Sequence, residues 1–127
     1  MSGRLTTEVI DTLRGTAAAG MLVDLFVLPH GGRERHHLKT METATADAPV
    51  LEPDAFAAGT YELLFHVGRY FKANRATLGD APFIDVLPIR FTVVTAERDH
   101  RVTLLVNPWC YTACVAYAPG AAPERDA

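Results

Sequence analysis

Two charged side chains stand inside apolar, alternating segments, and their types suit proton transfer and anion binding. Glu8 lies within residues 5–12, and Arg101 precedes Val102 in a second such segment. A carboxylate can act as a general acid or base, and a guanidinium can hold an anion or developing negative charge. Because side chains alternate along a strand, Glu8 shares a face with Ile10, and Arg101 shares one with Thr103 and Leu105.

A third alternating segment, residues 106–114, contains both cysteines and places Cys110, Thr112 and Cys114 on one face. Cys114 has two interpretations: a nucleophile or a thiol tuned by Arg101, or a small apolar wall residue, which we favour. The two cysteines are four residues apart on a strand, about 13 Å at 3.3 Å per residue. That separation excludes a disulfide between them within one chain.

Short β-branched and aromatic runs between turn residues predict an all-β sandwich of seven to eight strands. The expected strands are residues 5–12, 21–28, 36–45, 60–67, 83–94, 101–106 and 109–117. Residues 15–20 are small and are expected to form a loop, and residues 47–53, which contain two prolines, a loop or strand edge. Approximate 3.6 spacing within residues 68–78 predicts one short helix, and Pro88 predicts an edge strand or a bulge.

Composition excludes several classes of function. The chain has 127 residues, 49% of them hydrophobic, which predicts one domain over residues 1–117 and a disordered tail at 118–127. A net charge of −3 offers no basic surface for nucleic acid. No apolar run reaches the roughly 18 residues that span a membrane. The N-terminus lacks the layout of a signal peptide, so we expect a cytoplasmic protein.

The histidines do not predict a metal site. His36 and His37 are adjacent and therefore point to opposite faces of a strand, and the sequence supplies too few further ligands nearby. We expect both at the surface, and His66 as a hydrogen-bonded residue of the sandwich. No metal and no cofactor are expected.

Several segments, in the right order, resemble the transthyretin / 5-hydroxyisourate hydrolase family. Residues 5–12, Leu-Thr-Thr-Glu-Val-Ile-Asp-Thr, are similar to the family's opening Leu-Ser/Thr-Thr-His-Val-Leu-Asp-Thr. Residues 59–65 and 82–91 are similar to its middle strands, and residues 106–114 to its last strand. The resemblance covers residues 4–117. It implies a transthyretin-like (prealbumin-like) β-sandwich with one short helix, assembled as a homotetramer (a dimer of dimers) around a central channel.

The resemblance also implies that the hydrolase site is replaced. The family's first histidine falls on Glu8, its second on Arg101, and its turn arginine on Thr45. Its C-terminal Tyr-Arg-Gly-Ser falls on Cys114-Val115-Ala116-Tyr117. None of the four matches, and His100, one residue from the second histidine position, points to the opposite face. The chain is therefore not expected to be an active 5-hydroxyisourate hydrolase.

These positions give the candidate site. Glu8, Arg101 and Cys114 are the candidate catalytic residues. Candidate substrate contacts are Ile10, Thr45, Thr103, Leu105, Thr112 and Tyr117. We predict a repurposed enzyme of specialised metabolism that opens, cyclises or isomerises a small heterocycle or carbonyl compound. Two alternative functions stay open: a small-ligand-binding protein, or a vestigial or structural tetramer without a ligand. For the pair Glu8 and Arg101, the alternative to a catalytic role is a mutual salt bridge that keeps the channel mouth solvated.

Overall fold

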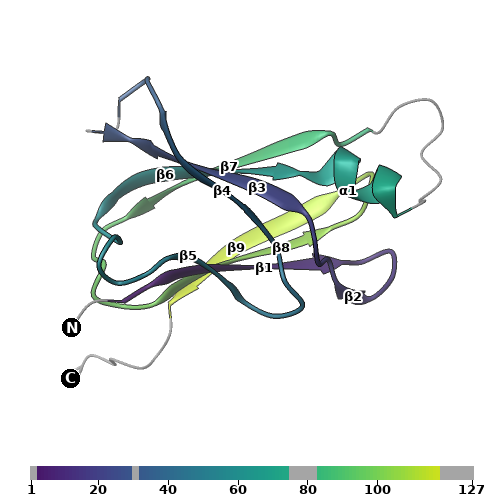
Figure 1. Cartoon of the computed structure of the whole chain (residues 1–127), viewed down its shortest axis with the longest axis horizontal. Coiled ribbons are helices and arrows are strands. Elements are labelled where there is room, and N and C mark those ends of the chain that lie inside the picture. The colour runs from purple at the N-terminus through teal and green to yellow at the C-terminus, as the bar shows by residue number, and fades with distance from the viewer. Residues whose placement is uncertain (1–2, 30–31, 75–82, 118–127) are drawn as a thin grey trace.

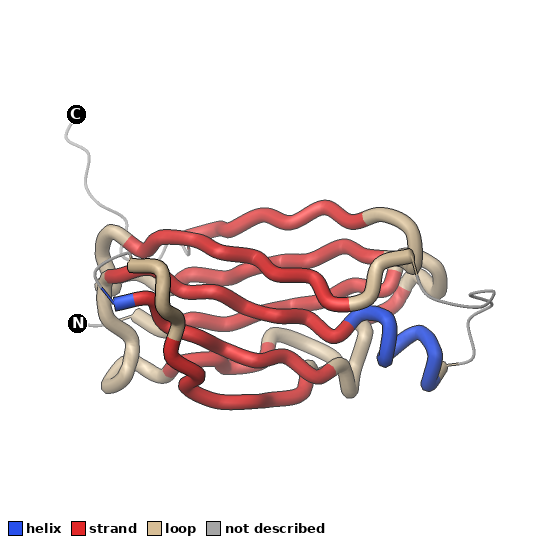
Figure 2. Tube along the Cα trace, turned by 90° about the horizontal axis from the view of Figure 1, so that it is seen from above, coloured by secondary structure: helices blue, strands red, loops and turns tan. Residues whose placement is uncertain are grey.

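The computed structural model describes residues 3–29, 32–74 and 83–117, which form two packed β-sheets with one helix at an end (Figures 1 and 2). The elements are β1 (Leu5–Asp11), β2 (Thr16–Ala17), β3 (Leu22–Leu28), β4 (His36–Glu42), β5 (Ala48–Leu51), β6 (Gly59–His66), α1 (Val67–Ala73), β7 (Val86–Val93), β8 (His100–Val106) and β9 (Tyr111–Tyr117). The predicted all-β sandwich with one short helix is confirmed. Two of the nine described strands, β2 and β5, are short and lie in segments expected to be loops or a strand edge. The tail at 118–127 lies outside the described residues.

Strand β1 has two neighbours along one of its edges, β2 and β5. One sheet has the order β2-β1-β8-β9, with β5 also paired to β1, and the other has the order β4-β3-β6-β7. Strand β5 pairs with the first half of β1 and β2 with its last two residues, whereas β8 runs parallel along the other edge of β1. The first half of β1 therefore lies between β5 and β8. Strand β7 is an edge strand, as Pro88 predicted.

Alternate residues of the strands build the core between the sheets. Leu5, Val9 and Leu104 of the first sheet are fully buried, as are Leu25 and Phe65 of the second. Burying a side chain of this size stabilises the fold by roughly 1.5–3 kcal/mol. The residues between these positions must face outward, so core packing fixes what the outer face of each sheet displays.

A buried carboxylate ties α1 to the end of β1. Asp11 accepts hydrogen bonds from the backbone N–H groups of Leu13 and Arg14, and from the Tyr70 hydroxyl at 2.9 Å. Burial raises the pKa of Tyr70, and its hydrogen bond to Asp11 adds to this effect. The helix ends at Ala73, and Asn74 donates both its backbone and its side-chain N–H to the Tyr70 carbonyl.

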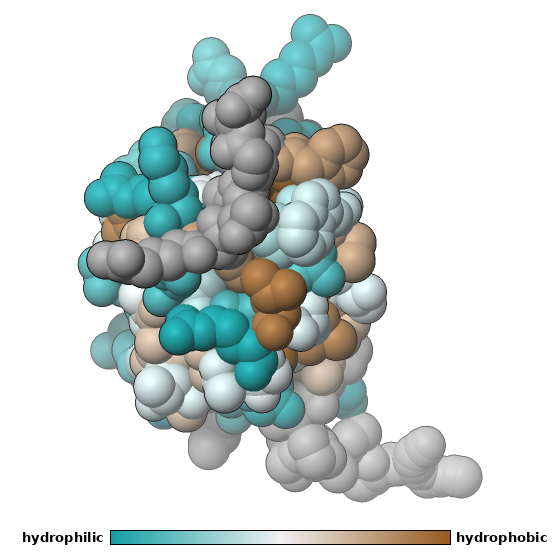
Figure 3. All heavy atoms as spheres, turned by 90° about the vertical axis from the view of Figure 1, so that its right-hand side faces the viewer, coloured by the Kyte–Doolittle hydropathy of each residue, from teal (hydrophilic) through white to brown (hydrophobic). Residues whose placement is uncertain are grey.

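The helix end of the sandwich exposes apolar residues. In Figure 3, hydrophilic residues predominate on the left flank of this end, and hydrophobic ones gather at its centre and right. The turns that follow β1 and β8 expose Leu13 (50%) and Trp109 (54%). About half of each of these two apolar side chains is therefore accessible to solvent at this end of the sandwich.

Candidate functional site on the outer face of a sheet

The outward-facing residues of β1, β8 and β9 form three rows across the first sheet, each row made of residues paired between neighbouring strands. The rows, named after one member each, are the Arg101 row (Thr6, Arg101, Ala116), the Glu8 row (Glu8, Thr103, Cys114) and the Leu105 row (Ile10, Leu105, Thr112). Backbone pairing thus aligns seven of the nine predicted site residues on one face. The face changes from charged at the start of β1 to apolar further along it.

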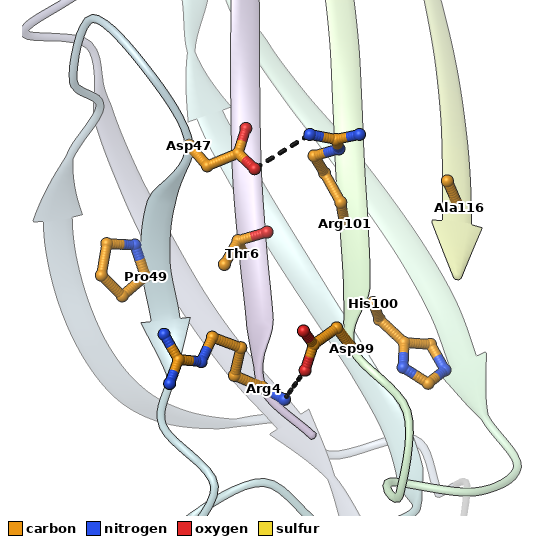
Figure 4. A pocket seen from close by; sticks show the side chains of 8 residues that line it. All are labelled: Arg4, Thr6, Asp47, Pro49, Asp99, His100, Arg101 and Ala116. Carbon is orange, nitrogen blue, oxygen red and sulfur yellow. Dashed lines mark hydrogen bonds and ion pairs between the residues drawn. The ribbon is translucent and has the colours of Figure 1, made fainter. Parts of the chain in front are cut away.

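A pocket of 330 Å³ opens at the Arg101 row. Nη1 of Arg101 lies 2.9 Å from Oδ2 of Asp47, which immediately precedes β5. Figure 4 shows the two side chains meeting across β1, beside the small side chain of Thr6. The pocket is lined by Arg4, Thr6, Asp47, Pro49, Asp99, His100, Arg101 and Ala116. A bulky residue at Thr6 would obstruct this crossing.

Arg4 brings a second guanidinium to the pocket. Its Nη2 is 3.7 Å from Oε1 of Glu52, and its backbone N–H donates to Oδ1 of Asp99 at 3.0 Å. The guanidinium of Arg4 is half exposed, and its ion pair is longer than that of Arg101. Both ion pairs are partly exposed, and exposed ion pairs contribute little to stability.

The Glu8 row places a carboxylate, a hydroxyl and a thiol side by side. Glu8 and Thr103 are half-buried, and Cys114 is exposed with a free thiol. The backbone of Glu8 belongs to the ladder between β1 and β8. Its carboxylate makes no hydrogen bond or ion pair with another residue in the part of the chain that the structure describes. Diagonal neighbours in a sheet have Cα atoms about 7–8 Å apart. Glu8 and Arg101 are diagonal neighbours in this sense, because Arg101 lies two residues before Thr103, the partner of Glu8. Arg101 lines the pocket and Glu8 does not.

Two predictions about this face are corrected. The mutual salt bridge of Glu8 and Arg101 is wrong, because Arg101 pairs with Asp47 and Glu8 lies opposite Thr103. Cys110 does not belong to the face, because it precedes β9 in a turn where its Sγ accepts a hydrogen bond from Asn107. Both cysteines are free and exposed.

The remaining predicted residues lie elsewhere. Thr45 is exposed in the segment between β4 and β5 and does not line the pocket, whereas Pro49 lies opposite Thr6 there. Tyr117 ends β9, and its side chain lies outside the described residues. His100 points inward, as predicted: it is 2% exposed, packs edge-on against Phe56 and has Nδ1 2.8 Å from the Arg98 carbonyl.

Sequence reasoning missed Thr6, Asp47 and Arg4. The alternation that links Glu8 and Ile10 also extends back to Thr6 and Arg4, so that signal was present in the sequence. Asp47 left no comparable signal, because it reaches the site from a short segment between strands and meets Arg101, 54 residues away in the chain.

The second sheet displays a different polar cluster on its outer face. Asp24 of β3 accepts from Thr40, and its two oxygens lie 3.1 Å and 2.8 Å from Nε2 of His37 and His66. Burial raises the pKa of Asp24, but hydrogen bonds from Thr40, His66 and His37 outweigh it and hold the pKa at about 2. Residues 3–29, 32–74 and 83–117 contain no group of His, Cys, Asp and Glu arranged to hold a metal. The predicted surface position of His37 and hydrogen bonding of His66 are confirmed.

The fold and the pocket at Arg101 define a class of protein: a two-sheet β-sandwich with a polar pocket of small-molecule size on the outer face of one sheet. Residues 5–114 match the HIUase/Transthyretin family, and the chain belongs to this family. The predicted transthyretin-like fold is thereby confirmed. Among the described helices, none is long and apolar enough to cross a membrane.

Named relatives support the same assignment. The chain is 41% identical over 114 residues to 5-hydroxyisourate hydrolase 2 of Rhizobium meliloti (strain 1021), covering 87% of this chain and 93% of that protein. It is 42% identical over 113 residues to the 5-hydroxyisourate hydrolase of Ralstonia nicotianae, covering 87% and 95%. Among solved structures, an (S)-allantoin synthase superposes with a TM-score of 0.80 at 27% identity. That match covers 91% of this chain but only 44% of the synthase.

Proposed function

We propose that this protein is a small-molecule enzyme that performs acid–base chemistry on a small heterocycle or carbonyl compound. Its site is the outer face described above. The observation that carries the proposal is the diagonal placement of Glu8 and Arg101, a carboxylate and a guanidinium on neighbouring strands of one face. The names of the relatives, 5-hydroxyisourate hydrolases, support a substrate of the same size and chemistry.

In this proposal Glu8 moves a proton and Arg101 holds negative charge. For a ring opening, Glu8 takes a proton from water as its oxygen attacks a ring carbonyl carbon, and then passes that proton to the departing nitrogen. Arg101 stabilises the charge that develops on the carbonyl oxygen. The same two roles serve cyclisation or isomerisation. Ile10 and Leu105 of the Leu105 row provide apolar contacts for the substrate. Cys114 lies beside Thr103 at the border of the site.

The proposal includes assembly into a homotetramer whose central channel this face lines. Exposed apolar residues support it: Leu105 on the face itself, and Leu13, Trp109 and Tyr111 around the helix end. Covering the face with a second copy would remove water from the site. Electrostatic interactions of Glu8 and Arg101 with a substrate are stronger in such a dry environment.

Hydrolysis of 5-hydroxyisourate itself is the second candidate, because relatives above 40% identity carry that name. Against it, Glu8 and Arg101 stand where the resemblance implies two histidines. A glutamate and an arginine can still open a ring, but the arginine cannot exchange protons near neutral pH. We therefore place a different heterocycle or carbonyl compound first.

The test compares turnover of freshly generated 5-hydroxyisourate by this protein and by the Rhizobium meliloti relative. A panel of related lactams and cyclic imides is assayed in parallel. We expect a rate with 5-hydroxyisourate at least about 100-fold below that of the relative, and a faster reaction with a panel member that Glu8→Gln slows about 100-fold. Glu42→Gln, which removes an exposed carboxylate of β4, is the matched control.

Each alternative has its own outcome. Equal rates of the two proteins with 5-hydroxyisourate would assign the relatives' reaction to this chain. No turnover of any compound, with saturable binding that survives Glu8→Gln and Arg101→Met, would contradict an enzyme and indicate a binding protein.

A further inference from the structure

The ion pair of Asp47 and Arg101 decides where the guanidinium lies. Arg101 is level with Thr6 in the strand register, yet its side chain does not stay there. Figure 4 shows it running away from Arg4, toward the C-terminal end of β1, to meet Asp47. The next outward residue of β1 in that direction is Glu8. Asp47 thus brings the guanidinium toward the Glu8 row.

The other residues around the pocket allow this displacement. Thr6 and Ala116 are the neighbours of Arg101 on β1 and β9, and both are small. Residues 48–51 of β5 pair with β1, and Lys39 Nζ donates to the Val50 carbonyl at 2.9 Å, which fixes the segment that follows Asp47. The carboxylate of Asp47 therefore directly precedes a strand, β5, that both β1 and Lys39 hold in place.

We propose that Asp47 is a positioning residue of the site. It binds Nη1 of Arg101, draws the guanidinium over β1, and presents the remaining N–H groups to an anionic ligand group lying between Arg101 and Glu8. A planar guanidinium has five donors, so one ion pair leaves donors for a ligand. Without Asp47, two other carboxylates compete for the guanidinium: Asp99, which lines the same pocket, and Glu8, the diagonal neighbour of Arg101. A direct pair of Arg101 with Glu8 would close the space that the ligand needs. This inference rests on the proposed function.

The first measurement is independent of any ligand. Side-chain NMR of the arginines, with Arg101 assigned through Arg101→Lys, compares the unliganded wild type with Asp47→Asn and Asp54→Asn. Asp54 is exposed in the segment after β5 and does not line the pocket, so it provides a matched loss of one carboxylate. We expect restrained, separate Nη signals for Arg101 in the wild type and in Asp54→Asn, and one averaged signal in Asp47→Asn. Averaged signals in the wild type would overturn the proposal.

The second measurement uses urate, a stable heterocyclic anion, as the probe in titration calorimetry. We expect Asp47→Asn to weaken urate binding about tenfold, the loss of one charge-assisted contact. Asp47→Glu should restore most of the affinity, and Asp54→Asn should leave it unchanged. Equal or tighter binding by Asp47→Asn would overturn the proposal, because Asp47 would then be a competitor of the ligand. Restrained Arg101 signals without urate binding would support the positioning by Asp47 and count against the proposed function.

Discussion

Arg101 of β8 stands diagonally from Glu8 of β1 on the same outer sheet face, and the two side chains do not form an ion pair. The guanidinium is bound instead to Asp47, at 2.9 Å. A carboxylate and a guanidinium that remain separate at this spacing can act on the two ends of one small molecule. The following predictions test this arrangement and the fold that holds it.

Glu8 is expected to act in turnover and to contribute little to the fold. Glu8→Gln keeps the shape of the side chain but cannot accept a proton, so kcat should fall about 100-fold while KM changes by less than about threefold. Steady-state kinetics and a thermal melt of both proteins check this. A large rise in KM with unchanged kcat would show that Glu8 binds the substrate without proton transfer.

Asp24 should make stability depend on pH in the acid range. Its pKa is held at about 2 in the folded chain, below its ordinary value of 3.8. A carboxylate with a depressed folded pKa contributes stability that is present above the unfolded pKa and is lost as pH falls through the folded pKa. The contribution is about 2 kcal/mol, lost between about pH 4 and pH 2.

Urea denaturation of the wild type and Asp24→Asn at several pH values measures this contribution. We expect the difference between their free energies of unfolding to be about 2 kcal/mol at pH 6 and to shrink toward pH 2. A difference that stays constant over this range would show that the hydrogen bonds of Asp24 do not depend on its ionisation.

The sequence predicted most strands because alternation and turn residues are local signals. It predicted the seven longer strands and α1, but it assigned β2 and β5 to loop or strand-edge segments. Two- and four-residue strands carry too little pattern to be recognised, and β5 forms only because β1 offers it an edge. The site residues also divide into those with a local signal in the sequence and those without one. The rows around Glu8 and Arg101 come from alternation, whereas Asp47 reaches Arg101 through tertiary structure alone.

Tyr70 is expected to stabilise the junction between α1 and β1. Tyr70→Phe removes the 2.9 Å hydrogen bond to Asp11 and leaves a buried carboxylate with fewer donors. A hydrogen bond to a charged group contributes about 1.5–3 kcal/mol, so unfolding should require correspondingly less urea. Tyr61→Phe, which removes a hydroxyl that donates to the Ala57 carbonyl and accepts from the Ala57 N–H, is the comparison because both partners are uncharged. It should cost only about 1 kcal/mol, and a larger loss for Tyr61→Phe than for Tyr70→Phe would contradict the role of Asp11.

Leu105 should contribute to assembly if the outer face lines a shared channel. Leu105→Glu places a charge on that face, whereas Leu38→Glu makes the same change on β4 of the other sheet, where Leu38 is 47% exposed against 39% for Leu105. Light scattering should report a tetramer for the wild type and Leu38→Glu, and a smaller species for Leu105→Glu. Identical masses for all three proteins would exclude this face from the assembly.

The most direct test of the site is a crystal structure of the protein soaked with urate. We expect the heterocycle on the outer face of the first sheet, over Thr6 and Thr103, with one oxygen bound by the Arg101 guanidinium and the opposite edge facing Glu8. The ion pair of Arg101 and Asp47 should persist in the complex. Urate bound elsewhere, for example beside Arg69 and Lys72 of α1, with the face of Glu8 and Arg101 empty, would contradict the placement of the site on this face.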